Sequence, residues 1–301
     1  NIEIKHINNR TELKNISQLL KYDSIHGKFN AKISFNNKNI IINNKKISYS
    51  RETEISKINW KKKDVDIVLE CTGKNNSKEK SFQHVKNGAR KVIVSAPCKN
   101  ADKTIVYGVN QKLINDKDLI ISAASCTTNC LAPIAMILND EFKIEKGFMT
   151  TIHSYTTDQR LLDNSHKDPR RGRSAAQSIV PTSTGASKAL GEIIPELKGK
   201  IEGIAMRVPT PNVSLIDLVF NSKNKLSINK INDSFKKASK KNLKNILDAT
   251  EEKLVSIDYN HNSNSAIVDL SLTNIVGDKM GKVSAWYDNE WGFASRMCDL
   301  V

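Results

Sequence analysis

The first part of the chain alternates short nonpolar runs with segments of helical spacing. Nonpolar runs occur at Val65–Glu70, Lys91–Ser95 and Leu119–Ser122, and Lys78–Asn87 has helical spacing and ends at Gly88. Buried strands separated by helices are typical of a mostly parallel sheet with crossover connections. In such sheets ligands bind at the carboxyl ends of the strands. The polar residues at those ends are Thr72-Gly73, Ser95 and Ser122–Cys126.

The pattern changes after Cys126. Nonpolar residues from Leu131 to Leu138 repeat at helical spacing, so a helix begins near Cys126, and Pro133 lies in its first turns, where proline is tolerated. Longer stretches rich in β-branched residues follow, with a helix predicted at Ile228–Lys241. These stretches are Phe148–Thr157, Gly203–Thr210, Val213–Asn221, Ala266–Ile275 and Lys282–Tyr287. They predict antiparallel strands in a second domain. The chain also opens with a predicted strand, Ile2–Asn8, and a helix, Thr11–Lys21.

The formal charge of +15 admits a nucleic acid, an anionic lipid or a phosphorylated substrate as partner. We favour compositional drift, because Lys, Asn and Ile are abundant everywhere and no basic helix is interleaved with aromatic residues. Nucleic-acid binding therefore has no support beyond net charge. No nonpolar run is long enough to span a membrane.

Cysteine use indicates a reducing compartment. The five cysteines are an odd number in a long chain, which argues against a disulfide framework and favours the cytoplasm. Cys126 and Cys130 are spaced closely, but no second Cys or His pair completes a zinc site, so we predict no metal.

The segment Ser125–Cys130 is the first candidate for chemistry. Its Cys126 is expected where a strand ends and a helix starts, and there the backbone N–H groups favour the thiolate, which is the nucleophile. The neighbouring Ser and Thr hydroxyls could bind phosphate oxygens. A buried structural cysteine at a helix start is the alternative.

A histidine and an arginine are the next candidates. His153 lies in a run of hydroxyl residues with Asp158 nearby, and a Cys–His pair would provide a nucleophile and a general base. A structural histidine is the alternative. Arg207 ends a nonpolar strand and needs an anionic partner, for which a phosphate is suitable. The hydroxyls and flexible backbone of Thr182–Gly185 also suit an anion.

These segments, in this order, resemble the phosphorylating glyceraldehyde-3-phosphate dehydrogenases over essentially the whole chain. The most specific motif is Ala124–Pro133, and further matching stretches are Tyr22–Phe29, Glu70–Gly73, Ser165–Arg171, Pro181–Ala186, Arg207–Ser214 and Tyr287–Gly292. The resemblance implies an α/β chain with a truncated, doubly wound Rossmann-type cofactor domain and an α+β catalytic domain whose sheet is mostly antiparallel. We expect domain boundaries at 1–125 and 126–290, with 291–301 starting a C-terminal helix that returns to the cofactor domain.

The resemblance also implies roles. Cys126 would attack the aldehyde of glyceraldehyde 3-phosphate, and His153 would take its proton. Oxidation with NAD or NADP would leave a thioester, which inorganic phosphate would release as 1,3-bisphosphoglycerate. Residues for substrate and inorganic phosphate would be Ser125, Thr127, Thr156, Asp158, Thr184, Gly185 and Arg207, with Asp158 orienting Arg207. Residues for the cofactor would be Asn9, Arg10, Arg51, Thr72, Gly73, Ser95, Ser165 and Asn289.

The family further implies a cytoplasmic homotetramer that acts in glycolysis or gluconeogenesis. Family members begin with a strand and a Gly-rich turn that the segment before Asn1 would have to supply. We therefore expect a longer gene product, of which residues 1–301 alone have little activity. An erythrose-4-phosphate dehydrogenase of the same superfamily is the nearest alternative, and a thiol hydrolase would not need the phosphate-binding set.

Cofactor selectivity rests on two positions. The acidic residue that NAD-selective members place after Ile-Asn is replaced here by Asn9, followed by Arg10. The other position, before His166-Lys167-Asp168, carries Ser165 where NAD-selective members often have proline. Both changes favour use of NADP as well as NAD, whereas drift to asparagine is the alternative explanation.

Overall fold

The protein folds into two compact units in the computed structural model, which describes residues 2–301. The first unit contains the chain up to Lys103, residues 114–122 and Val301, and the second contains residues 104–113 and 123–300.

One sheet of the first unit has the strand order β1-β6-β5-β4. Its strands are β1 (His6–Asn8), β4 (Ile33–Phe35), β5 (Asn39–Ile42) and β6 (Lys45–Ser50), and helix α1 (Leu13–Lys21) contacts β4 and β5. β1 runs parallel to β6, whereas β4, β5 and β6 are antiparallel neighbours. The β5–β6 turn holds Asn43 and Asn44 at φ values of 48° and 67°, a conformation that asparagine tolerates in two-residue hairpins. A small hairpin, β2 (Tyr22–Asp23) with β3 (Gly27–Lys28), follows α1.

The other sheet of this unit has the order β7-β8-β10-β9. Its strands are β7 (Ile67–Glu70), β8 (Lys91–Val94), β9 (Lys103–Thr104) and β10 (Ile120–Ser122), with helix α2 (Lys78–Lys86) between β7 and β8. Of β9, Lys103 belongs to the first unit and Thr104 to the second. β7 and β10 both run parallel to β8, and Glu70, Val94 and Ser122 are in register. The carboxyl ends of three strands therefore meet at one edge, as the sequence predicted.

The second unit is built on one large mixed sheet with the order β12-β13-β11-β14-β18-β16-β15, with β17 beside β18. Its strands are β11 (Ile144–Ser154), β12 (Val180–Ser183), β13 (Ile201–Val208), β14 (Ser214–Ser222), β15 (Leu247–Thr250), β16 (Ala266–Asp269), β17 (Asn274–Val276) and β18 (Met280–Tyr287). Only the β11–β13 and β15–β16 pairs are parallel. The mostly antiparallel sheet and the α/β fold class predicted from the sequence are confirmed.

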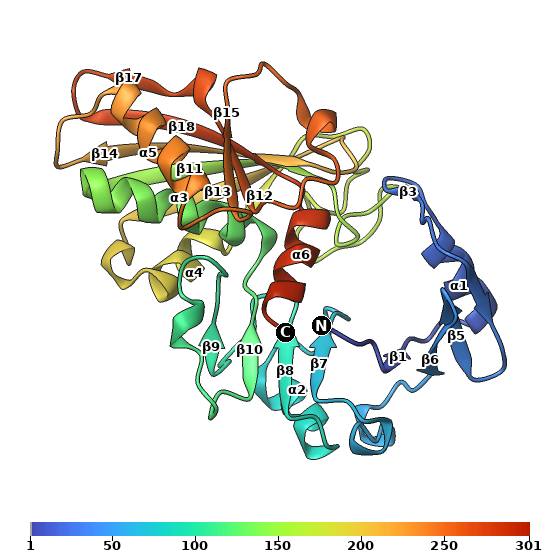
Figure 1. Ribbon diagram of the computed structural model, residues 1–301. Helices are drawn as coiled ribbons and strands as arrows, with labels where there is room; N and C mark the ends of the chain where they lie inside the picture. The colour runs from blue at the N-terminus through green and yellow to red at the C-terminus, as the bar shows by residue number, and fades with distance from the viewer. Residues whose placement is uncertain (1) are drawn as a thin grey trace. The chain divides into compact units, whose positions relative to one another are not determined.

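Helices α3 (Cys126–Phe142) and α5 (Ile228–Lys240) pack on this sheet, and α4 (Ala186–Ile193) packs on α3 (Figure 1). The core between them includes Leu131, Leu138, Ile216 and Phe235, all fully buried. Short 3₁₀ helices lie at Ile55–Lys57, Lys61–Lys63, Gln111–Leu113, Pro195–Leu197, Ser256–Tyr259 and Leu270–Leu272.

Several expected elements differ in detail. The first strand is limited to His6–Asn8, and the stretch 266–275 is not one strand, because the Asp269 carboxylate accepts from the Ser271 backbone N–H and turns the chain there. Residues 104–113 belong to the second unit, where Val106 joins the core and Gly108 approaches Ile246. The C-terminal helix α6 (Trp291–Asp299) is part of the second unit.

Candidate active site

Cys126 is the first residue of α3, as the sequence predicted. Ser125 is the N-cap, and its hydroxyl accepts from the Thr128 backbone N–H at 3.1 Å. Just before it, Ala124 has a φ of 59°, a left-handed conformation that costs a non-glycine residue free energy and is concentrated at functional sites. The turn therefore places the thiol beside the first N–H groups of the helix.

His153 is the next-to-last residue of β11, and its Nε2 is 3.5 Å from the Cys126 Sγ. The side chain is buried, and its ring edge faces Tyr287 at a centroid distance of 5.9 Å. The structure thus brings together the two residues that the sequence proposed as nucleophile and base.

Arg207 is held beside His153 by strand register. β13 runs parallel to β11, and Arg207 pairs directly with His153. The Arg207 Nη1 lies 2.7 Å from His153 Nδ1 and donates to the Ser154 carbonyl at 3.0 Å. The Arg207 Nε is buried without a hydrogen-bond partner among residues 2–301. A guanidinium with a free buried N–H is suited to binding an anion.

The structure shows no hydrogen bond or ion pair between Asp158 and Arg207 among residues 2–301, so their expected interaction stays a prediction. Asp158 instead forms an ion pair with Arg171, and its other oxygen lies 3.6 Å from His166 Nε2. Arg171 is the better partner because its guanidinium is fixed over this carboxylate by Thr182, whose hydroxyl accepts from Nε at 2.9 Å. Arg207 is turned toward His153 and the Ser154 carbonyl instead.

Opposing effects act on the protonation of the catalytic pair. Burial raises the pKa of the Cys126 thiol, whereas the positive charge of Arg207 and the N–H groups at the start of α3 lower it. Burial, together with Arg207, lowers the pKa of His153 to about 3. A neutral imidazole 3.5 Å from the thiol can accept its proton.

Three residues that the sequence analysis did not assign complete this centre, namely Tyr287, Ser154 and Ser214. The hydroxyl of Tyr287 lies 2.9 Å from the Thr127 hydroxyl and 2.8 Å from the Thr151 hydroxyl, which ties α3 to β11. Ser154 donates to the Asn289 side-chain carbonyl at 2.9 Å, and Ser214 does the same. The motif Tyr287–Gly292 signalled this region, but only the fold shows what Tyr287 contacts.

The candidate phosphate residues come from separate segments. Thr184 and Gly185 precede helix α4, with Gly185 at its N-cap and the Thr184 hydroxyl accepting from the Ala186 N–H at 3.3 Å. A helix N-terminus of this kind favours anions. Thr156 follows β11, and the Tyr155 N–H bonds the Thr210 carbonyl at 3.1 Å, so the segments after β11 and β13 stay adjacent.

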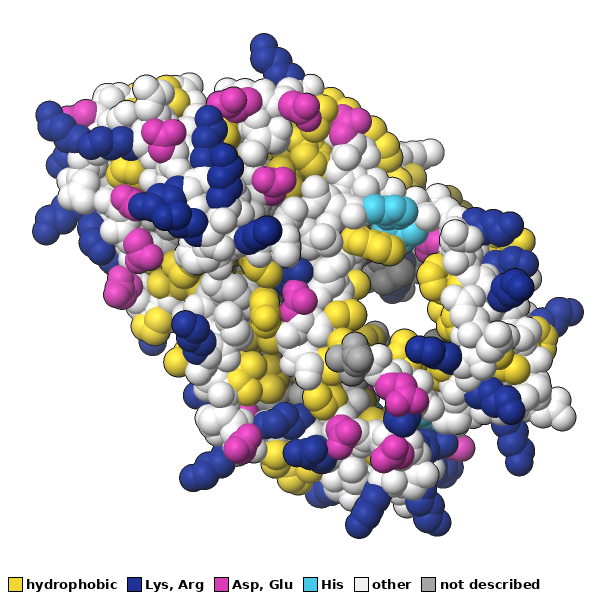
Figure 2. Space-filling view, in the orientation of Figure 1, with side chains coloured by type: hydrophobic (Ala, Val, Ile, Leu, Met, Phe, Trp, Pro, Cys, Tyr) yellow, Lys and Arg dark blue, Asp and Glu magenta, His cyan; other side chains and the backbone are white. Residues whose placement is uncertain are grey.

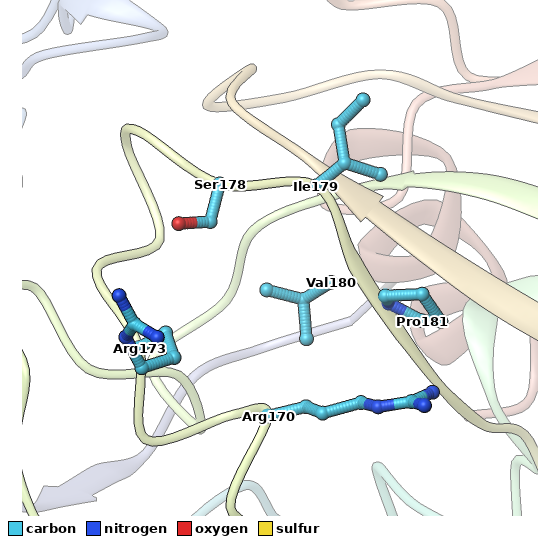
Figure 3. A pocket seen from close by; sticks show the side chains of 6 residues that line it. All are labelled: Arg170, Arg173, Ser178, Ile179, Val180 and Pro181. Carbon is cyan, nitrogen blue, oxygen red and sulfur yellow. The ribbon is translucent and has the colours of Figure 1, made fainter.

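A separate open pocket lies among residues 170–181, in the segment that leads into β12, as Figure 3 shows. Its lining residues are Arg170, Arg173, Ser178, Ile179, Val180 and Pro181. None of the proposed catalytic residues lines it. Ser165 lies in the same loop, where its backbone N–H bonds the Asn164 side chain at 2.7 Å. Figure 2 shows Lys and Arg side chains spread over the visible face among acidic ones rather than gathered into one stripe.

In the first unit, the candidate cofactor residues follow strand ends. Asn9 and Arg10 come after β1 and Arg51 comes after the parallel strand β6, and Arg51 Nε donates to the Arg10 carbonyl at 3.1 Å. The Asn9 side chain accepts from the Thr11 N–H at 2.9 Å. Arg51 is 3.7 Å from Glu12. The position expected to bind the ribose is thus an amide flanked by two arginines.

The second sheet supplies the remaining candidates. Thr72 and Gly73 follow β7 and Ser95 follows β8, so all three lie at the carboxyl edge of the parallel strands. Gly73 has a φ of 70° and open space where a Cβ would stand, which allows close approach of a ligand to the backbone. These residues fit a dinucleotide, which binds at this edge of such sheets. In the second unit, Asn289 lies directly after β18 and the Asp288 that follows it, and its side-chain oxygen accepts from Ser154 and Ser214.

Comparison with known proteins identifies two domains of one family. Residues 1–78 match the NAD-binding domain of glyceraldehyde 3-phosphate dehydrogenase, and residues 125–289 match its C-terminal domain. Together these matches cover most of the chain.

Similar curated proteins extend over the whole chain. It is 48% identical over 301 residues to glyceraldehyde-3-phosphate dehydrogenase of Geobacillus stearothermophilus, covering 100% of this chain and 90% of that protein. It is 46% identical to glyceraldehyde-3-phosphate dehydrogenase 2 of Bacillus subtilis (strain 168), covering 88% of that protein. It is 50% identical over 306 residues to glyceraldehyde-3-phosphate dehydrogenase 2 of Trichormus variabilis, of which it covers 90%.

Proposed function

We propose that this chain, which belongs to the glyceraldehyde 3-phosphate dehydrogenase family, oxidises and phosphorylates D-glyceraldehyde 3-phosphate to 1,3-bisphosphoglycerate. The observation that carries the proposal is the 3.5 Å contact of Cys126 Sγ with His153 Nε2 at the start of α3, with Arg207 alongside. A thiol, a base and a cation in this arrangement suit an aldehyde that carries a phosphate.

The first step joins Cys126 to the substrate. The thiol proton moves to His153 Nε2 while a bond forms between Sγ and the aldehyde carbon. In the tautomer that leaves Nε2 free, Nδ1–H donates to the Ser154 carbonyl at 2.7 Å, and Arg207 Nη1 donates to that same carbonyl at 3.0 Å and not to Nδ1. The Cys126 backbone N–H and the protonated imidazole then stabilise the developing oxyanion.

The second step yields a thioester. Bound oxidised nicotinamide supplies the two-electron acceptor for this step. Asn289 orients the acceptor through its amide nitrogen, because its side-chain oxygen is held by Ser154 and Ser214, each at 2.9 Å. The protonated imidazole first gives its proton to the oxyanion, and His153 takes it back from the resulting hydroxyl as the carbonyl re-forms and the hydride leaves for the acceptor, so the acyl group remains on Cys126.

Two sets of residues bind the two phosphate groups. Arg207 and Thr156 bind the phosphate of the substrate, and Ser125, Thr127, Thr184 and Gly185 bind the inorganic phosphate. Attack of an inorganic phosphate oxygen on the thioester carbon breaks the C–S bond and releases the acyl phosphate, and the Cys126 thiolate is protonated again. Asp158 contributes indirectly, through its ion pair with Arg171.

We also propose a cytoplasmic homotetramer. Three large nonpolar side chains, Leu161, Leu162 and Ile179, are between 68% and 76% exposed. Exposure of nonpolar surface to water costs free energy, and a second copy of the chain that covered these side chains would remove that cost. Light scattering after size exclusion should give four subunits, and a monomeric enzyme would contradict this part. No helix among residues 2–301 is long and nonpolar enough to cross a membrane.

Assays of the purified full-length enzyme test the function. Nicotinamide reduction should require glyceraldehyde 3-phosphate, and multiple turnovers should require inorganic phosphate. Erythrose 4-phosphate should be a poor substrate. Faster turnover with erythrose 4-phosphate, or turnover that does not depend on phosphate, would contradict the proposal.

A further inference from the structure

A buried chain of polar side chains runs beneath the loop that follows β7. It consists of Trp60, His84 on α2 and Glu70 at the end of β7, which are only 4–5% exposed. The Trp60 Nε1 is 3.1 Å from His84 Nδ1, and His84 Nε2 is 3.0 Å from a Glu70 oxygen. None of these residues has a role in the reaction derived above.

The donor in each of these contacts follows from chemistry. An indole nitrogen only donates, so His84 Nδ1 must accept from Trp60. The ring proton therefore lies on Nε2 and is donated to Glu70 Oε2. Trp60 thus selects the tautomer of His84 that can bind a carboxylate.

The other bonds of Glu70 lead into the loop. One carboxylate oxygen accepts from the backbone N–H of Thr72 at 2.8 Å and from its hydroxyl, and the other accepts from the Asn75 amide at 2.9 Å. Burial raises the pKa of Glu70, but the hydrogen bonds from His84, Thr72 and Asn75 outweigh it and lower the pKa to about 2. A buried carboxylate is costly unless it is fully bonded, so this one is tied to a single loop conformation.

The loop that Glu70 holds is the one assigned to the cofactor. The Thr72 hydroxyl is turned down to Glu70, which leaves the backbone of Thr72 and Gly73 exposed at the carboxyl edge of the sheet. Among residues 2–301, the Gly73 N–H makes no hydrogen bond to another backbone group. Its left-handed φ and the open space beside it present this backbone to a ligand.

We propose that Glu70, oriented by His84 and Trp60, is a positioning residue that fixes the Thr72–Gly73 backbone for the dinucleotide and so sets cofactor affinity. This inference rests on the proposed function, because that function assigns Thr72 and Gly73 to the cofactor. Glu70 does not touch the reacting atoms, so its loss should affect cofactor binding and not the chemical step.

The primary test replaces Glu70 by glutamine in the full-length enzyme. An amide must direct its NH₂ either at the Thr72 N–H or at His84 Nε2–H and Asn75, and either choice sets a donor against a donor. The dissociation constant for NAD, measured by calorimetry, should rise at least about tenfold. The turnover number at saturating NAD should stay within about twofold.

A matched control is available in the same unit. Asp118 is also buried, and its carboxylate bonds the Asn115 N–H at 2.9 Å, but it precedes β10 and so lies at the amino edge. Asp118→Asn should leave the NAD dissociation constant unchanged. Thr72→Val, at an exposed position, keeps the backbone bond to Glu70 and removes the hydroxyl, with its bonds to Glu70 and to the Lys74 N–H. It serves if Glu70→Gln does not fold, and it should also weaken NAD binding.

A double variant tests the direction of the bonds. Trp60→Phe removes the donor to Nδ1 and frees His84 to place its proton there, so that Nε2 can accept from the side-chain amide that Glu70→Gln introduces. Trp60→Phe/Glu70→Gln should therefore bind NAD more tightly than Glu70→Gln alone. If the two substitutions caused unrelated packing defects, their unfavourable effects on NAD binding would add, and the double variant would bind more weakly.

The outcomes are distinct. Unchanged NAD binding in Glu70→Gln or, if that variant does not fold, in Thr72→Val would overturn the inference, as would a double variant that binds no better than Glu70→Gln. Equal weakening by Asp118→Asn would also overturn it, since buried charge in general would then be the cause. A wild-type enzyme that binds no nicotinamide dinucleotide would instead refute the proposed function on which the inference rests.

Discussion

Replacement of Arg207 by leucine tests the assignment of the substrate phosphate. The guanidinium lies beside His153 through the β11–β13 register, and its Nε has no partner among residues 2–301. Leucine keeps much of the nonpolar stem and removes the charge and every donor. The variant should therefore bind the phosphorylated substrate more weakly.

The magnitude follows from one lost bond to a charged group. Such a bond is worth about 1.5–3 kcal/mol, and about 1.4 kcal/mol corresponds to a factor of ten. The Michaelis constant for glyceraldehyde 3-phosphate should thus rise roughly 10- to 150-fold. A second bond to the same phosphate would raise the factor further.

Steady-state assays with two aldehydes provide the measurement. Arg207→Leu should impair glyceraldehyde 3-phosphate oxidation strongly and oxidation of unphosphorylated glyceraldehyde much less. Arg173→Leu is the matched control, because Arg173 is exposed and paired with Asp163 at 2.8 Å. An unchanged Michaelis constant in Arg207→Leu, or an equal loss with both aldehydes, would refute the reasoning.

Three further predictions follow. Iodoacetate should label Cys126 first and abolish activity in parallel; loss of activity with only another cysteine labelled would remove Cys126 as the nucleophile. The enzyme should accept NADP as well as NAD, because Asn9 leaves no carboxylate to repel a 2′-phosphate, and Asn9→Asp should selectively weaken NADP; a preference for NAD above about a hundredfold would contradict this. Burial, with Lys63, lowers the pKa of His6 to about 4 from 6.5, so the unfolded chain binds the extra proton between these values and stability should fall as pH drops from 6.5 to 4. His6→Gln should flatten that part of the pH profile in urea unfolding, and an unaltered slope would exclude His6 as the cause.

Features set by neighbouring residues were predictable from the sequence. Nonpolar spacing and the capping Ser125 place the start of α3 at Cys126, and the short nonpolar runs identify the parallel strands. The family resemblance added a fold and a function, and the family, the α/β class and the dehydrogenase activity expected from it agree with the comparisons. The roles of individual site residues stay predictions.

Contacts between distant segments were not predictable in the same way. The sequence signalled both Asp158 and Arg207, but their separation in the fold depends on Arg171, which takes the carboxylate. The bonds of Tyr287 to Thr127 and Thr151 join three elements, and no local pattern specifies them. Nothing in the sequence indicated that a loop, a helix and a strand would place Trp60, His84 and Glu70 in contact, and only the structure shows these hydrogen bonds.

The central claim is that Cys126 carries the acyl group, and a single turnover without phosphate tests it most directly. Enzyme mixed with NAD and glyceraldehyde 3-phosphate should produce reduced nicotinamide equal in amount to the active sites and then stop. Mass spectrometry of the quenched protein should place a phosphoglyceroyl group on Cys126, and added phosphate should remove it. Continued turnover without phosphate, or an acyl group on any other residue, would contradict the account.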